Sequence, residues 1–213
     1  MSLINNIGSL IGMFTQSDQN EESKELAKRA GVDTKDFGKI AAAALPLLLQ
    51  AMNIKNQNSE GLTSFNRALN QHHTKNNYDS LSQFARNVDT EDGDKIVNHI
   101  FQDDKQKLSD RLAGKLDVNP DTVKKVLAVL APLVLKYLAD QKYEKGLDAE
   151  DVQRETQNVA RQATTEAKKM SRENPKDYGV IGDLLGLGST TTNGTADGGK
   201  GSGFLDGLFD LFK

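Results

Sequence analysis

A chain of 213 residues, 37% hydrophobic and 27% charged, has enough apolar material for a buried core and is rather polar overall. The absence of cysteine excludes disulfides, thiolate metal sites and cysteine nucleophiles, and the absence of tryptophan removes a favoured anchor of binding sites. The formal net charge of −3 argues against nucleic acid as a partner, because proteins that bind it usually carry a basic excess.

The N-terminal region has apolar residues at helical spacing, which predicts a helix over residues 2–14 and a polar connector after it. The apolar residues are Leu3, Ile4, Ile7, Leu10, Ile11 and Phe14. No Lys or Arg precedes them and no small-residue cleavage site follows, so we expect a cytoplasmic protein rather than an exported one. The longest apolar runs, 40–49 and 126–135, are about half as long as a bilayer crossing requires.

Further helices are predicted along the rest of the chain by the same spacing, over residues 22–30, 34–53, 60–72, 78–86, 92–102, 106–116, 120–140 and 148–172. Gly31 is expected to end the first of these, Asp33 or Thr34 is expected to cap the next, and Asn119 is expected to cap the helix over 120–140. No segment alternates between apolar and polar residues in the manner of a strand. The sequence therefore predicts an all-α fold, a multihelical bundle.

Residues 26–52 and 112–138 are two versions of one segment, aligned without a gap. Identical residues stand at Leu26/Leu112, Ala27/Ala113, Val32/Val118, Lys39/Lys125, Ala42/Ala128, Pro46/Pro132, Leu47/Leu133 and Leu49/Leu135. Each copy reads as a polar helix, a capped turn and an apolar helix that contains a proline. The bundle is therefore predicted to be built on two αα-hairpin repeats, about 23–55 and 107–141.

Pro46 and Pro132 stand at the same place in the two copies, well inside the predicted apolar helices. A proline there removes a backbone hydrogen bond and clashes with the preceding turn. We interpret both as kinks in buried helices, and a break into two shorter helices is the alternative.

Three regions are predicted from composition. Residues 1–145 form the helical domain with the internal duplication, residues 146–178 form a polar helix on the surface or against a partner, and residues 179–213 form a Gly-rich linker with an apolar tail.

The segment DGDKIVNHIF at residues 92–101, followed by a polar helix and VNPDTVKKVLAVLAPLVLKYL, resembles the bacterial DUF937 family, also called YidB-like. The shared pattern is an acidic-Gly turn, Ile-x-x-His-Ile-Phe, and a helix pair that ends in Leu-Ala-Pro-Leu. The resemblance covers about 90–140, and by duplication 23–55; Gln102 stands where the family often has glycine. It implies a multihelical bundle and no activity, since the family's function is unknown.

The acidic run at residues 89–94 invites a calcium interpretation, but the loop fails the EF-hand pattern. If Gly93 is sixth, Val88 is first and His99 is twelfth, where acidic ligands are required. We therefore interpret these acids as caps of the next helix, at its positive end.

The three histidines, His72, His73 and His99, do not form a convincing metal site. His72 and His73 are adjacent, so on a helix they point about 100° apart. We expect no metal and no cofactor, and we interpret His99 as a structural histidine.

A helix–turn–helix that binds DNA is one alternative, because both hairpins have the required pattern. The second helices, however, run into AAAALPLLL and VLAVLAPLVL, which need burial, and only Lys39, Lys124 and Lys125 offer positive charge near their starts. An enzyme with a site between the repeats is a further alternative. No Ser-His-Asp arrangement, phosphate loop or metal-hydrolase motif is recognisable, so no catalytic residues are predicted.

The C-terminal peptide FLDGLFDLFK is the best functional candidate in the sequence. On a helix its apolar side chains would share one face, namely Phe204, Leu205, Leu208, Phe209, Leu211 and Phe212. A tethered apolar peptide can bind another protein, a second copy or its own domain, and membrane-surface binding is the rival interpretation. We expect a non-enzymatic scaffold or protein-interaction protein with this peptide as the docking element.

Overall fold

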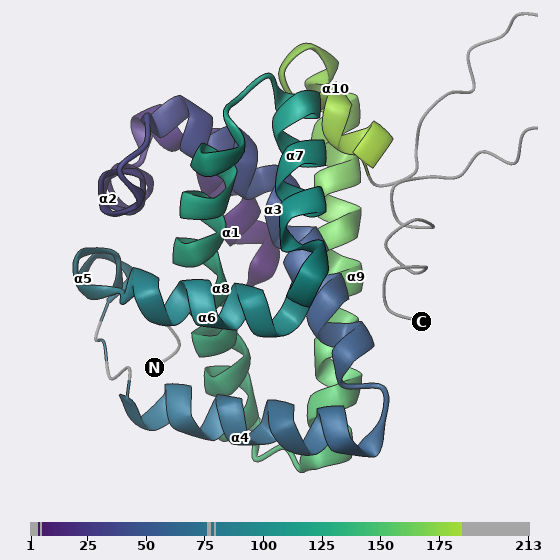
Figure 1. Cartoon of the computed structure of the whole chain (residues 1–213). Helices are drawn as coiled ribbons and strands as arrows, with labels where there is room; N and C mark the ends of the chain where they lie inside the picture. The colour runs from purple at the N-terminus through teal and green to yellow at the C-terminus, as the bar shows by residue number, and fades with distance from the viewer. Residues whose placement is uncertain (1–3, 5, 76–77, 79, 185–213) are drawn as a thin grey trace, which may run out of the picture.

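The computed structural model describes residues 4, 6–75, 78 and 80–184, and Figure 1 shows the helical arrangement of this part of the chain. The helices are α1 (Ile7–Thr15), α2 (Glu21–Ala30), α3 (Thr34–Lys55), α4 (Ser59–Lys75), α5 (Leu81–Asn87), α6 (Thr90–Phe101), α7 (Lys105–Leu116), α8 (Pro120–Lys145), α9 (Ala149–Glu173) and α10 (Pro175–Leu184). Two short 3-10 turns, η1 (Ser17–Gln19) and η2 (Gln102–Asp104), connect some of them. The described residues contain no strand, and the predicted all-α class is confirmed.

The core is built around α3 and α8, which pack against each other. α9 lies along α3, α6 crosses α8, and α4 lies across one end of the bundle (Figure 1). Both central helices are buried on nearly every side over their apolar runs. Such all-round burial is what a helix without a polar face requires.

The two hairpins have the same local structure at equivalent positions. The amide of Val32 donates to the carbonyl of Ala27 at 3.0 Å, and the amide of Val118 donates to the carbonyl of Ala113 at 3.1 Å. This hydrogen bond closes a helix C-terminus around a left-handed residue, which is Gly31 (φ 65°) in α2. Asp117 (φ 54°) takes the same place in α7.

The second helix of each hairpin begins at the expected cap. The Asp33 side chain accepts from the amides of Lys35 and Asp36, and the Asn119 side chain accepts from the amide of Asp121. Capping satisfies amides that would otherwise have no partner in the first turn. The helix starts predicted at both positions are confirmed.

Both apolar helices continue through their prolines. Pro46 lies inside α3 and Pro132 lies inside α8. The alternative in which each proline divides its helix is therefore wrong, and the kink stays a prediction.

The N-terminal helix is shorter than predicted. α1 begins at Ile7 because the Asn6 side chain accepts a hydrogen bond from the amide of Ser9 at 2.8 Å. Of the apolar residues noted in this stretch, Leu3 lies outside the described residues and the others are buried.

α9 and α10 belong to the same hydrophobic core as the helices before residue 145. α9 has a narrow apolar face that includes Val159, Ala163 and Ala167. This face is buried, and α9 packs along α3. The pattern of mostly small residues allows this close approach, while the other face of α9 remains polar. α10, which the sequence pattern did not predict, returns along α9, and its Tyr178 hydroxyl donates to the carbonyl of Thr15 at 3.0 Å.

Two glycines permit helices to approach closely. A Cβ on Gly93 of α6 would overlap the carbonyl oxygen of Ala128 in α8, and one on Gly38 of α3 would overlap the carbonyl oxygen of Phe14. The close contacts between α6 and α8 and between α1 and α3 therefore require glycine, which has no side chain, at these two positions.

By length and composition, α3 is the single helix of the described part that could cross a membrane. In the fold, however, 78% of its most apolar window is buried against the other helices. This burial is what the central helix of a bundle requires.

Candidate functional site

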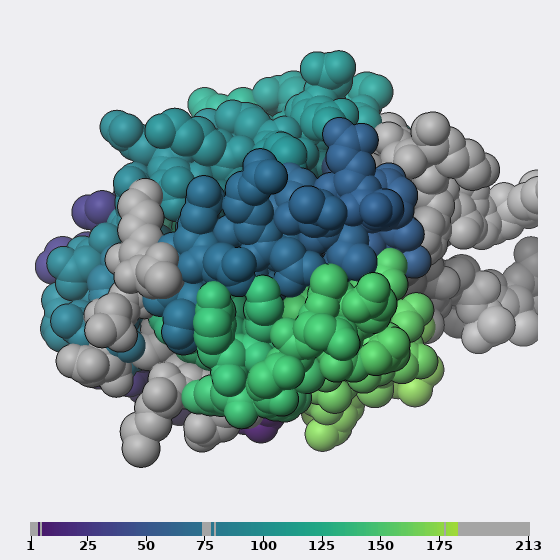
Figure 2. Space-filling model, turned by 90° about the horizontal axis from the view of Figure 1, so that it is seen from below, coloured from purple at the N-terminus to yellow at the C-terminus, as the bar shows by residue number. Residues whose placement is uncertain are grey.

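A groove of about 260 Å³ lies between α4 and α6, and the end of α3 and Leu135 of α8 contribute to its floor. Figure 2 shows α4 running across this face of the molecule, with α6 along one side and the α8–α9 connection along the other. The groove therefore lies where the unrepeated middle of the chain covers the ends of both hairpins.

The groove is lined by one stripe of each helix. The α4 residues are Gly61, Ser64, Phe65, Ala68, Gln71 and His72, and the α6 residues are Asp92, Lys95, Ile96, His99 and Ile100. Spacings of three and four residues place side chains on one side of a helix. The local periodicity of each segment thus determines which side chains face the groove.

The floor of the groove is apolar. Phe65, Ile100, Met52 of α3 and Leu135 of α8 are all buried, and Ile96 is partly buried. Such a surface favours apolar side chains, because each square ångström removed from water contributes about 25 cal/mol.

The rim of the groove is more cationic than acidic. The lining includes two lysines, Lys55 and Lys95, and one carboxylate, Asp92. His99 of α6 is exposed beside them. Asp92 is also engaged with His72 across the α4–α6 interface, with Nε2 and Oδ2 3.7 Å apart. The rim therefore favours a ligand with negative charge.

The serine of the groove lies too far from His72 to form a nucleophile–base pair with it. Ser64 and His72 both line it, but they are eight positions apart on α4, which corresponds to about 12 Å along a helix. A hydrogen bond between a serine and its base requires about 3 Å. A Ser-His-Asp triad is therefore excluded for these residues.

The adjacent histidines contact different helices, as their angular separation predicts. His73 Nδ1 is 3.7 Å from Oδ1 of Asp140 in α8, while His72 faces α6. Among the described residues, no group of three or more His, Asp or Glu side chains is placed to hold a metal ion.

The contacts of His73 belong to a polar cluster that joins α4 to α8. Asp140 forms a buried ion pair with Lys136, one turn earlier on α8, and the His73 ring stacks on Tyr143 with centroids 3.7 Å apart. The Tyr143 hydroxyl in turn donates to Oδ1 of Asn70 at 3.1 Å. The cluster fixes α4 on the end of α8 and thereby holds one wall of the groove.

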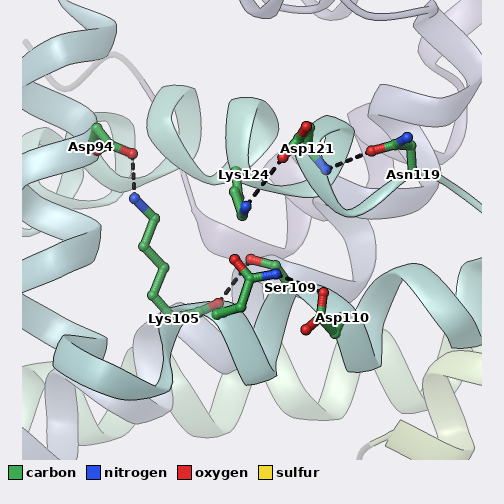
Figure 3. Close-up of polar contacts among 8 residues, drawn as sticks. Asp94, Lys105, Ser109, Asp110, Asn119, Asp121 and Lys124 are labelled. Atoms are coloured by element: carbon green, nitrogen blue, oxygen red, sulfur yellow. Dashed lines mark hydrogen bonds and ion pairs between the residues drawn. The ribbon is translucent and has the colours of Figure 1, made fainter.

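The acidic run is confirmed as a cap only at Asp89, because α6 begins at Thr90, two residues earlier than predicted, and the other acids of the run lie inside the helix. Oδ1 of Asp89 accepts from the amides of Glu91 and Asp92 at 3.0 and 3.1 Å. Asp94 binds Lys105 and so joins α6 to the start of α7, as Figure 3 shows.

The lysines considered for DNA binding lie near the starts of α3 and α8. Lys124 donates to Asp121 at 3.1 Å, beside the Asn119 cap (Figure 3). Lys39 is partly buried and Lys125 is exposed. After these residues both helices enter the core, so their apolar runs do not form a surface for a DNA groove.

The six predicted partner-binding residues lie outside the described part of the chain, from Phe204 to Phe212. No local sequence pattern indicates the groove, because it depends on how α4 and α6 meet in space. The buried pair was also missed, although Lys136 and Asp140 interrupt an apolar run at the spacing of an ion pair.

A family model described as a bacterial protein of unknown function (DUF937) matches residues 12–141, which is more than half of the chain. The chain belongs to this family, as its resemblance indicated. The match covers α2 through most of α8, and therefore both hairpins and the groove between α4 and α6. The comparisons with curated proteins and with solved structures found no match.

Proposed function

We propose that the protein is a non-enzymatic helical scaffold or interaction protein of the cytoplasm, with the apolar C-terminal peptide 204–213 as its docking element. One observation carries the proposal: the helical domain has a groove with an apolar floor and a cationic rim, and the same chain carries an apolar peptide with two aspartates. The two features are chemically complementary.

The size of the groove supports a peptide as its ligand. Pockets for small molecules and cofactors commonly measure about 300–1,000 Å³. A cavity of about 260 Å³ lies at the lower edge of that range and has room for a few side chains. Recognition of a peptide by a few anchored side chains is a common way for helical domains to bind partners.

The engagement of the polar groups also supports an interaction role. The described acids that the sequence singled out, such as Asp89 and Asp94, are used for caps and for contacts between helices. Asp140, which pairs with Lys136 within α8, also lies 3.7 Å from His73 of α4. Each of these groups has a role in holding the fold.

Removal of residues 204–213 from the full chain tests the proposal. We expect the molar mass in light scattering, or the set of proteins captured from a bacterial lysate, to change. A matched control removes residues 190–199 from the linker and keeps the tail. The proposal is contradicted if the shortened chain keeps both the molar mass and the captured proteins of the full chain.

A further inference from the structure

We propose that the groove between α4 and α6 is the receptor for the C-terminal peptide of the same chain, and that residues 204–213 occupy it. This inference rests on the proposed function and adds the surface to which the docking element binds. Its occupant is defined by chemistry: an apolar segment with aspartates, for an apolar floor with a rim of lysines.

The apolar contacts would come from the phenylalanines and leucines of the tail. If residues 204–213 form a helix, these side chains share one face and can enter the groove together. The buried walls formed by Phe65, Ile100 and Leu135 offer them an apolar surface. Burial of one large apolar side chain contributes about 1.5–3 kcal/mol, so a few such anchors suffice for binding.

The charges of the tail and of the rim favour the orientation in which the apolar face of the tail enters the groove. Asp206 and Asp210 lie opposite the apolar face and would remain outside the groove. A helix is about 10–12 Å across, and the Debye length at physiological ionic strength is about 8 Å. The attraction of the two carboxylates by Lys55 and Lys95 on the rim is therefore weak at physiological ionic strength and becomes stronger at low salt.

The connection between the fold and the tail is long enough. α10 lies near the start of α3, through the bond from Tyr178 to Thr15, while the groove lies at the end of α3. The 22 residues of α3 span about 33 Å. Residues 185–203 reach about 60 Å when fully extended, and their composition predicts a flexible tether.

The tether also decides between the tail of the same chain and that of a second copy. A short flexible linker gives its peptide an effective concentration in the millimolar range. A second copy at micromolar concentration competes poorly with it. The peptide of the same chain is therefore the expected occupant.

Disulfide trapping in the full chain tests the inference. Because the chain has no cysteine of its own, only the introduced pair can form a disulfide. One variant combines Ser64→Cys, in the groove, with Gly207→Cys, in the tail. The matched control combines Thr63→Cys with Gly207→Cys. Thr63 is the neighbouring residue of α4 but lines a different hollow, beside Leu147. Both pairs therefore have almost the same tether.

We expect the Ser64 pair to close at least about tenfold faster than the Thr63 pair, because docking raises the local concentration on one side of α4 only. The disulfide should form within one chain, at a rate independent of protein concentration. Lys95→Glu or Phe209→Ser, added to the Ser64 pair, should slow closure to the rate of the control. Circular dichroism confirms that each variant is folded.

Equal rates for the two pairs would overturn the inference, as would disulfide-linked dimers whose yield rises with concentration. These outcomes are distinct from failure of the proposed function. If deletion of the tail changes mass or partners while the two pairs close equally, the tail docks elsewhere. If the Ser64 pair closes selectively while deletion changes neither, the groove assignment stands and the wider interaction role is wrong.

Discussion

The two hairpins share a turn but differ in the ends of their long helices. The Lys136 and Asp140 of α8, which form a buried ion pair, correspond to Gln50 and Ile54 of α3. Gln50 instead donates to Thr164 of α9 at 3.4 Å. The repeated segments thus determine the local hairpin, whereas the unrepeated helices packed on each copy determine which residues its far end requires.

The largest loss of unfolding free energy is expected when only one partner of the Lys136–Asp140 ion pair is removed. Asp140→Ala leaves Lys136 charged and buried without its carboxylate, which typically costs about 3–5 kcal/mol of unfolding free energy. Lys136→Gln combined with Asp140→Ile gives the second copy the residues of the first. We expect this double variant to lose less than the single one in urea denaturation. An equal or greater loss would show that the pair itself supplies the stability.

The packing on α8 can be broken at Gly93. Gly93→Ala brings a methyl group onto the carbonyl of Ala128 and forces α6 away from α8, at a cost of about 1–3 kcal/mol. Gly114→Ala in α7 is the matched control, because nothing lies within 4 Å of its Cβ position. The control should gain up to about 1 kcal/mol. Thermal unfolding measures both, and similar midpoints for the two variants would contradict the close contact.

The turns of the two hairpins can be made more alike. Asp117 adopts the left-handed conformation that Gly31 adopts in the first copy. Asp117→Gly should therefore stabilise the protein by up to about 1 kcal/mol, and Gly31→Asp should destabilise it by a similar amount. Chemical denaturation of both variants checks the equivalence. Changes of the same sign in the two variants would show that the turns are not equivalent.

A similar gain in stability is expected from a substitution at Gln102, just after α6. Gln102 has φ 48° and ψ −126°, a conformation that favours glycine. Gln102→Gly should relieve about 1 kcal/mol of strain. Thermal unfolding measures the gain, and a lower midpoint would show that the side chain matters more than the backbone.

The smallest effect on stability is expected from the titration of Tyr137 in α8, at the position where the first copy has Ala51. Burial, and then the carboxylate of Glu155, raise the pKa of Tyr137 above its ordinary value of 10.0, although a backbone hydrogen bond with Ile7 lowers it. The folded state thus favours the neutral phenol. Its contribution is complete below pH 10 and is lost as the pH rises through the raised pKa. Tyr137→Phe should weaken the loss of stability above pH 10, and an identical pH profile would contradict this assignment.

The sequence predicted the hairpins well because their signals are local. Asp33, Asn119 and Gly31 act on residues within one or two turns, and their pattern needs no knowledge of the rest of the fold. The apolar runs of α3 and α8 likewise required burial in any arrangement.

The remaining features depend on contacts distant in sequence. α9 reads as a polar surface helix because its small buried residues contribute little apolar signal, yet they allow close packing on α3. The groove requires Phe65 of α4 to face Ile100 of α6, and no local pattern defines that pairing. The role of Gly93 follows only from the position of Ala128.

We infer that the unrepeated helices α4 and α6 form a receptor for the tail of the same chain. Nuclear magnetic resonance of the full chain and of the chain without residues 204–213 tests it most directly. If the tail lies in the groove, amide shifts change mainly along the groove, at residues such as Ser64, Lys95 and His99, while the far side of α4 at Thr63 changes little. Unchanged groove amides, or changes centred on another surface, would contradict it.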